Sequence, residues 1–145
     1  DTVRWLTGAE FVSVDSRQRQ VMNPVVEDHF LTRAELSDGC WANCEVSKYT
    51  DSRCGWFEAV GDKGQLLADY VGDAGLVLRI GNDEERIEVS AMAPTLPPLL
   101  TDWLTAVETG TAPPVTVQDG LATLAVVDAC YRSDSSGSPV AVSIG

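Results

Sequence analysis

Apolar residues crowd the stretch DGLATLAVVDACYRS at residues 119–133. When successive residues are placed about 100° apart, apolar side chains occupy most of the circumference. Only Asp128 and Arg132 mark a clear polar strip. A surface helix needs one apolar stripe, whereas a helix that is apolar on most sides has to be covered on more than one. The pattern therefore predicts a helix, and it raises the question of what covers its second side.

Alternation of apolar and polar residues dominates the earlier part of the chain and predicts strands. The clearest case is residues 28–50, where two alternating arms meet at a Ser-Asp-Gly turn at 37–39. One face of this hairpin is apolar. The other face is mixed, because Trp41 and Tyr49 stand beside charged residues such as Glu45. Such a face suits a cleft or a protein interface.

The remaining pattern completes an α+β chain. A strand at 9–17 and two more hairpins, turning at 61–64 and 81–83, extend an antiparallel sheet. A short helix ends at Gly8, and the 3.6-residue period returns at 96–110. We expect one broad, open, mainly antiparallel sheet with the two late helices on one face. The other sheet face is then free for oligomerisation or for a substrate cleft.

The length and the net charge of the chain exclude some classes of function. The 145 residues suffice for one domain with a core. A net charge of −12 repels phosphate backbones, so nucleic-acid binding is not expected. No apolar run approaches the ~20 residues of a membrane span, and no signal-peptide pattern opens the chain. We therefore expect no membrane partner and a cytoplasmic location.

Four cysteines, at positions 40, 44, 54 and 130, would permit two disulfides. Cys40 and Cys44 lie ~13 Å apart along one strand face, too far for a disulfide or a shared zinc ion. We predict that all four are reduced, small, buried apolar residues.

Motifs for catalysis are absent from the residues themselves. His29 follows Asp28, but neighbouring strand side chains point to opposite faces, so the two are not a catalytic pair. Neither a dinucleotide fingerprint nor a phosphate-binding loop is present. The sequence predicts no catalytic, cofactor-binding or metal-binding residue of its own.

The two ends of the chain share a pattern with a known family. Residues 110–143 carry a glycine and prolines, a T-x-x-D-G-L helix start, an alanine-rich helix ending in A-x-Y-x-S, a glycine turn and a strand. The opening DTVRWLTGAEFVSV fits D-x-x-R-W-L-x-G-x-x-x-x-V. Both resemble the Gfo/Idh/MocA oxidoreductases, relatives of glucose-fructose oxidoreductase and inositol dehydrogenase. The matching residues are Asp1, Arg4, Trp5, Leu6, Gly8, Gly110, Pro113, Thr116, Asp119, Gly120, Leu121, Ala129, Tyr131, Ser133 and Gly137.

The resemblance implies that residues 1–145 are a single C-terminal α/β domain, whose partner is an N-terminal Rossmann domain outside this chain. NAD or NADP would bind to that domain in the full-length protein, and this fragment would bind neither and be inactive alone. The family's E-K-P lysine and the histidine of its D-x-x-x-H-x-x-D motif would lie upstream. That motif would end at Asp1, so Asp1 and Arg4 are the candidate substrate-binding residues. The alternatives are an exposed terminal residue for Asp1 and an ion pair for Arg4.

Three functions remain open. The first is the substrate-binding and oligomerisation domain of an NAD(P)-dependent oxidoreductase acting on a sugar, cyclitol or related hydroxyl compound. It includes a homodimer through the open sheet face, with Trp41, Glu45 and Tyr49 in the interface. The second is a non-catalytic protein-interaction module of the same fold. The third is an unrelated α+β ligand-binding protein with a similar closing pattern. For the helix at 119–133, one side would pack on the sheet and another on the 96–110 helix or the absent nucleotide domain.

Overall fold

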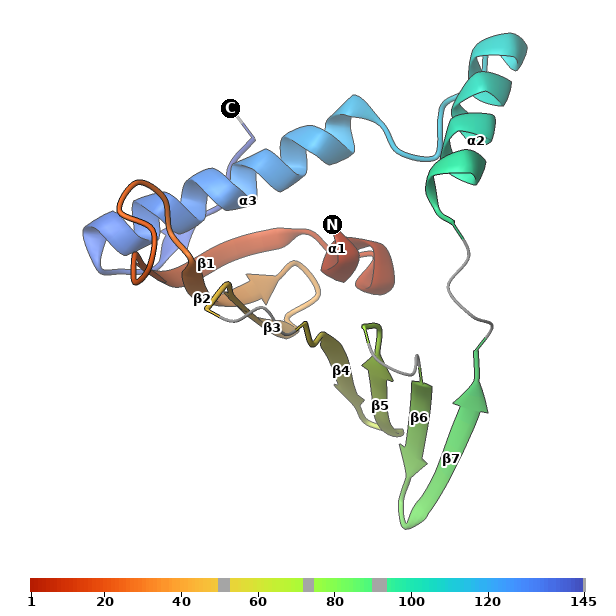
Figure 1. Ribbon diagram of the computed structural model, residues 1–145, viewed down its shortest axis with the longest axis horizontal. Coiled ribbons are helices and arrows are strands. Elements are labelled where there is room, and N and C mark those ends of the chain that lie inside the picture. The colour runs from red at the N-terminus through yellow and green to blue at the C-terminus, as the bar shows by residue number, and fades with distance from the viewer. Residues whose placement is uncertain (50–52, 72–74, 90–93, 145) are drawn as a thin grey trace. The chain divides into compact units, whose positions relative to one another are not determined.

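The computed structural model describes residues 1–49, 53–71, 75–89 and 94–144, and Figure 1 shows its helices and strands. The chain divides into two compact units, Asp1–Tyr49 with Ala106–Gly145 (unit 1) and Thr50–Thr105 (unit 2). Each unit contains one four-stranded antiparallel sheet. The open antiparallel α+β fold is therefore confirmed. The expectation of one broad sheet is wrong for the described residues, because strand pairing stops after the third strand and resumes separately from the fourth.

The sheet of unit 1 has the strand order β3-β2-β1-β8. Its strands are β1 (Phe11–Arg19), β2 (His29–Leu36), β3 (Trp41–Ser47) and β8 (Val140–Ala141). The predicted turn joins β2 to β3, with Gly39 at a left-handed φ of 84°. Thr32 pairs with Cys44, and Arg33 pairs with Asn43. This register confirms the predicted apolar and mixed faces of the hairpin.

Helix α3 (Val117–Ser136) covers the apolar face of this sheet. It begins with a capping box, in which the side chains and backbone N–H groups of Thr116 and Asp119 bond reciprocally. Small residues on its inner side let the helix backbone approach the strands closely. Ala129 is fully buried against Val14 and Ala34. Ser133, also fully buried, accepts a 2.9 Å hydrogen bond from the backbone N–H of Ser16.

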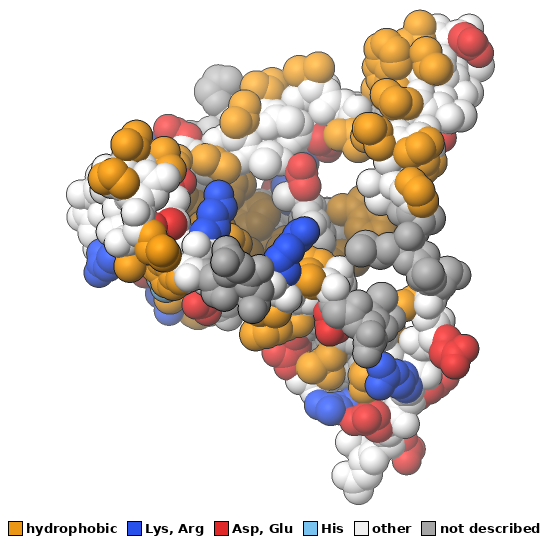
Figure 2. All heavy atoms as spheres, in the orientation of Figure 1, with side chains coloured by type: hydrophobic (Ala, Val, Ile, Leu, Met, Phe, Trp, Pro, Cys, Tyr) orange, Lys and Arg blue, Asp and Glu red, His pale blue; other side chains and the backbone are white. Residues whose placement is uncertain are grey.

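The side of α3 that faces away from the sheet is not covered in unit 1. The sheet covers only one side of the helix. Large apolar side chains on the other side are exposed (Figure 2), and they are Val117, Leu121, Leu124, Val127 and Tyr131. These residues recur at helical spacing and form one stripe. The outer side of α3 is therefore an apolar surface in unit 1.

Two further helices are present in the described residues. Helix α1 (Thr2–Thr7) ends at Gly8, whose left-handed φ of 68° is the predicted stop. Helix α2 (Leu96–Thr109) matches the predicted range closely, and most of its apolar side chains are exposed. None of the helices found in the described residues is long and apolar enough to cross a membrane.

The sheet of unit 2 is a meander of hairpins in the order β4-β5-β6-β7. Its strands are β4 (Trp56–Gly61), β5 (Gly64–Asp69), β6 (Gly75–Ile80) and β7 (Asp83–Glu88). The two predicted turns are confirmed. Gly64 is required where it stands, because a Cβ there would collide with the backbone carbonyl oxygen of Arg79. No described residue of these four strands is fully buried.

Candidate functional site

Arg4, one of the two predicted substrate-binding residues, lies at the centre of an ion-pair cluster in unit 1. Its guanidinium donates two hydrogen bonds of 2.7 and 2.8 Å to the carboxylate of Glu10. A third nitrogen, Nη1, lies 3.8 Å from Asp1 and 3.6 Å from Asp119. The Arg4 side chain is only 14% exposed. The hydrogen bond with Glu10 raises the pKa of Arg4 and lowers that of Glu10.

Asp1, the other predicted residue, connects α1 to α3. Its carboxylate accepts a hydrogen bond from the hydroxyl of Thr123. The pKa of Asp119 is lowered, chiefly by the backbone N–H and the hydroxyl of Thr116 and further by Arg4. The structure thus brings Asp1 and Arg4 together, and both residues connect α1 to the first half of α3. Contact with a substrate stays a prediction for both.

The mixed face of the unit 1 sheet is uncovered in unit 1 and holds the predicted interface residues. Trp41 is 67% exposed. The guanidinium of Arg33 lies 5.1 Å from the centre of its ring, in cation–π geometry. Arg33 also lies 3.5 Å from Asp15, which pairs with Arg17 at 2.9 Å. Our sequence reasoning missed the contribution of Asp15 and Arg17, although β1 has the same two-residue alternation as the hairpin.

Glu45 and Tyr49, the other two predicted interface residues, meet at His29. The Nε2 atom of His29 lies 3.3 Å from a carboxylate oxygen of Glu45. The ring of His29 meets that of Tyr49 edge to face, with centres 5.3 Å apart. Burial raises the pKa of Tyr49. The face therefore carries aromatic groups at both ends with separate ion pairs beside them, and that composition suits another protein surface better than bulk water.

Asp28 has a structural role that the sequence did not reveal. Its buried carboxylate accepts hydrogen bonds from the backbone N–H groups of Val21, Met22 and Asn23, at 2.9, 2.6 and 2.8 Å. Burial opposes ionisation, but the three donors outweigh it and hold the pKa of Asp28 below its usual value. Asp28 thus orders the loop between β1 and β2, while His29 lies on the mixed face. The prediction that the neighbours do not act as a pair agrees with this geometry.

The cysteines correct one prediction. All four are free thiols, as expected. Cys44 and Cys130 are partly buried, and burial raises the pKa of Cys44. Cys40 and Cys54 are exposed instead. Cys40 directly precedes β3, and Cys54 lies two residues before β4.

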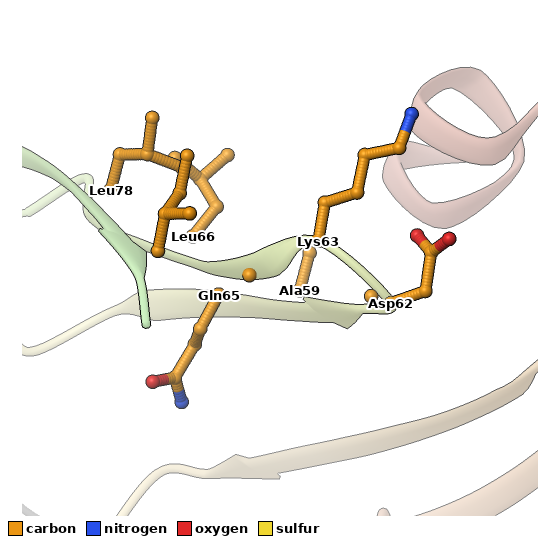
Figure 3. A pocket seen from close by; sticks show the side chains of 9 residues that line it. Ala59, Asp62, Lys63, Gln65, Leu66 and Leu78 are labelled. Atoms are coloured by element: carbon orange, nitrogen blue, oxygen red, sulfur yellow. The ribbon is translucent and has the colours of Figure 1, made fainter. Parts of the chain in front are cut away.

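One face of the unit 2 sheet is hollowed near the first hairpin turn. The hollow measures about 250 Å³, and Figure 3 shows its side chains. Leu66 and Leu78 rise on one side, Gln65 points to the other, and Asp62 and Lys63 stand at the turn. This shallow apolar depression assembles no pair of proton-transfer groups.

The described residues show neither a cluster of metal ligands nor the turn of a Rossmann-type nucleotide site. They contain no cluster of three or more His, Cys, Asp or Glu side chains that could hold a metal. Every strand pair in the described ranges is antiparallel. A dinucleotide site of the Rossmann type needs a glycine-rich turn from a parallel strand into a helix.

Solved structures share this fold. The aldose-aldose oxidoreductase of Caulobacter crescentus, solved with glycerol, is 26% identical, with a TM-score of 0.82 over 96% of this chain and 43% of its own. A levoglucosan dehydrogenase with NADH and L-sorbose is 19% identical, with a TM-score of 0.82 over 99% and 47%. An oxidoreductase of Agrobacterium radiobacter with NAD⁺, L-tartaric acid and magnesium is 18% identical, with a TM-score of 0.80 over 97% and 45%.

This chain therefore spans less than half the length of each of these proteins. No curated protein matches it. The family described as "Oxidoreductase family, C-terminal alpha/beta domain" matches residues 1–142, nearly the whole sequence. The expected resemblance to this family is thereby confirmed. The chain belongs to the Gfo/Idh/MocA oxidoreductase family, whose C-terminal alpha/beta domain it matches.

Proposed function

We propose that this chain is the substrate-binding and oligomerisation domain of an NAD(P)-dependent oxidoreductase that acts on a sugar, a cyclitol or a related hydroxyl compound. Residues 1–145 form a single C-terminal domain in this proposal, preceded by a Rossmann domain. That domain binds NAD or NADP and carries the proton-transfer groups. The fragment alone is inactive, and the protein acts in the cytoplasm.

The family match over residues 1–142 carries the proposal. Two observations support it. The solved relatives carry about as much additional chain again, and their bound molecules include NADH, NAD⁺, L-sorbose and L-tartaric acid. The described residues also offer exposed apolar and mixed surfaces, as expected of a half that shapes a cleft or makes a subunit contact.

The decisive experiment compares two purified proteins, the full-length protein and the 145-residue chain. Each is incubated with NAD⁺ or NADP⁺ and a panel of aldoses, ketoses and cyclitols, and formation of reduced nicotinamide is followed. We expect turnover only from the full-length protein, and saturable nucleotide binding only there. Turnover or nucleotide binding by the 145-residue chain would contradict the proposal, as would a full-length protein that binds neither nucleotide.

Homodimerisation belongs to the same proposal and uses the mixed face of the unit 1 sheet. Trp41 supplies an exposed aromatic anchor at one end, and the His29–Glu45–Tyr49 cluster supplies a second at the other. Interface cores are enriched in aromatic residues and arginine, and Arg33 already stacks on Trp41. A two-fold axis would place this self-complementary face against its copy.

Trp41→Asp tests the dimer by sedimentation velocity. We expect a shift toward the monomer, because the substitution removes the anchor and places a charge in the contact. The control is Trp5→Asp, which changes another exposed tryptophan in unit 1 that lies on α1 rather than on the sheet face. An association state that Trp41→Asp leaves unchanged would eliminate this face as the contact.

The alternative proposal is a non-catalytic interaction module of the same fold, and the mixed sheet face is the observation in its favour. The sequence upstream of Asp1 separates the two. A strand followed by Gly-x-Gly-x-x-Gly, then Glu-Lys-Pro, and a histidine three residues before Asp1 supports the dehydrogenase. Loss of the lysine and the histidine supports the module.

A further inference from the structure

Two of the four cysteines lie beside the same threonine, between α3 and the sheet of unit 1. Thr32, on β2, is buried, and its hydroxyl oxygen lies 3.7 Å from the sulfur of Cys130 on α3. Cys44, on β3, stands directly opposite Thr32 in the strand register. Directly paired residues point to the same sheet face, with Cβ atoms about 4.5–5.5 Å apart. Cys44 and Cys130 therefore flank one side chain, although they are far apart in the sequence.

The neighbours of Cys44 on β3 show that its thiol faces the helix. Ala42, two residues earlier and on the same face, packs with Cys130 against the core cluster under α3. Cys44 is partly buried, whereas Asn43 and Glu45 on either side of it are exposed. Burial raises the pKa of the Cys44 thiol, and the neighbouring Cys130 raises it further. The space between β3 and α3 thus holds a pair of thiols.

A buried hydrogen bond keeps Thr32 in place between these two thiols. The hydroxyl oxygens of Ser16, on β1, and Thr32 lie 2.8 Å apart, and both side chains are buried. A hydroxyl fixed in this way holds the Cys130 sulfur beside β2, on the side of α3 that looks toward Cys44. The position of the Cys130 sulfur is therefore set by the fold, and not by a freely rotating surface side chain.

The place of β3 in the sheet lets the two cysteines approach further. The strand order is β3-β2-β1-β8, so within this sheet β3 is an edge strand that pairs with β2 alone. A disulfide needs Cα atoms about 4.4–6.8 Å apart. An edge strand bends more readily than a central strand, because only one ladder of hydrogen bonds restrains it. Bending of β3 toward α3 shortens the distance between Cys44 and Cys130.

We propose that Cys44 and Cys130 form a reversible disulfide when hydrogen peroxide oxidises the protein, and that this bond fastens the edge of the sheet to α3. One thiolate attacks a peroxide oxygen, the O–O bond breaks, and a sulfenic acid and water are formed. The second thiol then attacks the sulfenic sulfur, the S–O bond breaks, and water leaves as the S–S bond forms. The pair loses two electrons and two protons, which peroxide takes up in forming water.

This redox device is separate from the proposed dehydrogenase activity, because both thiols belong to this chain and neither touches a nucleotide or a substrate in the proposal. Disulfides of proteins in reducing compartments are usually transient and serve to sense oxidants. Both thiols are partly buried, so a small oxidant reaches them more easily than a large one. A thiol reductant such as dithiothreitol reverses the bond by thiol–disulfide exchange.

Peroxide treatment of the full chain, followed by peptide mass spectrometry without reduction, tests the bond. The background is Cys40→Ser with Cys54→Ser, which removes the two exposed thiols and leaves only the proposed pair. We expect one linked peptide that contains Cys44 and Cys130 within a single chain and disappears with dithiothreitol. Thermal unfolding of the oxidised protein should show a Tm raised by several degrees, because the cross-link restricts the unfolded chain.

The matched control keeps the exposed thiols and removes the proposed pair, as Cys44→Ser with Cys130→Ser. It should give no linked peptide within the chain and no rise in Tm, and circular dichroism checks that each variant folds. The proposal is overturned if peroxide leaves Cys44 and Cys130 unlinked, or if it links them only between two chains. A linked protein whose Tm equals that of the reduced protein would overturn the fastening of the sheet to α3.

Discussion

Each unit holds one sheet of four antiparallel strands, yet among the described residues only the sheet of unit 1 has a buried face. Val14 and Ala34 lie under α3 in unit 1. In unit 2, none of the described strand residues reaches the same burial. The difference arises from α3, whose small inner residues let a helix lie close on the strands. Strand pairing alone therefore gives a sheet its form, and a covering layer gives it a core.

Val14→Ala should cause the largest loss in the free energy of unfolding, if the sheet of unit 1, which α3 covers, is the more stable of the two sheets. Val14 is 1% exposed, and the substitution leaves a cavity under α3. We expect a loss of about 2–3 kcal/mol in the free energy of unfolding, measured by urea denaturation. The control is Val60→Ala on β4, where the side chain is 76% exposed and a change within ~0.5 kcal/mol is expected. Equal losses in the free energy of unfolding at the two sites would show that the sheet of unit 1 is not better packed than the sheet of unit 2.

Gly64→Ala should damage the uncovered sheet by itself, at a cost of about 2 kcal/mol. The added Cβ would collide with the carbonyl oxygen of Arg79, so β5 and β6 have to separate. Amide hydrogen exchange should accelerate in β4–β7 while β1 and β2 keep their protection. Gly61→Ala, at the other end of the same turn, is the control, because its Cβ would meet only Gly64 oxygen at 4.0 Å. Faster exchange throughout both units would show that they unfold as one.

Thr116→Ala removes the cap of the covering helix and should cost about 1 kcal/mol. The hydroxyl of Thr116 takes part in the reciprocal bonds that start α3. Thr101→Ala is the comparison in α2, where the hydroxyl only donates to the carbonyl oxygen of Pro97 within an exposed helix. Thermal unfolding followed by circular dichroism should show a lower Tm for Thr116→Ala only.

Glu10→Gln should have the smallest effect, a few tenths of a kcal/mol, because the Glu10 carboxylate is 60% exposed and solvent screens its interaction with Arg4. The hydrogen bond with Arg4 lowers the pKa of Glu10 from its ordinary value of 4.5. A carboxylate with a lowered folded-state pKa stabilises the fold above its ordinary pKa, and the gain is lost as pH falls through the folded value. Urea titrations between about pH 6 and pH 3 should therefore show a shallower pH dependence for Glu10→Gln. If the pH dependence of the free energy of unfolding stayed unchanged, the Arg4–Glu10 pair would not contribute to stability against acid.

Local signals in the sequence predicted local structure well. The alternation from residue 28 to 50 placed the hairpin and both its faces, and Thr116 with Asp119 placed the start of α3. Gly8 marked a helix end because a left-handed residue stops a helix wherever it occurs. Such features depend on neighbours a few positions apart, so a single sequence contains them.

Features that depend on distant neighbours were not predictable in this way. The division into two sheets depends on which strands pair, and the alternation of a strand does not name its partner. Arg33 stacks on Trp41 only because the hairpin register brings them together. The role of Asp28 depends on a loop that folds back on its carboxylate, and the neighbouring sequence does not reveal that loop. The conclusions about the parent enzyme came from the family resemblance at the two ends, which is independent of all these contacts.

The buried hydroxyl of Ser133 has a mechanical consequence. It accepts the N–H of Ser16 on β1 and donates to the carbonyl oxygen of Ser138, so strand, helix and the turn after the helix meet at one atom. Sliding α3 along the strands by a single turn would leave a buried amide without an acceptor. This pair of hydrogen bonds therefore fixes the register of α3 along β1.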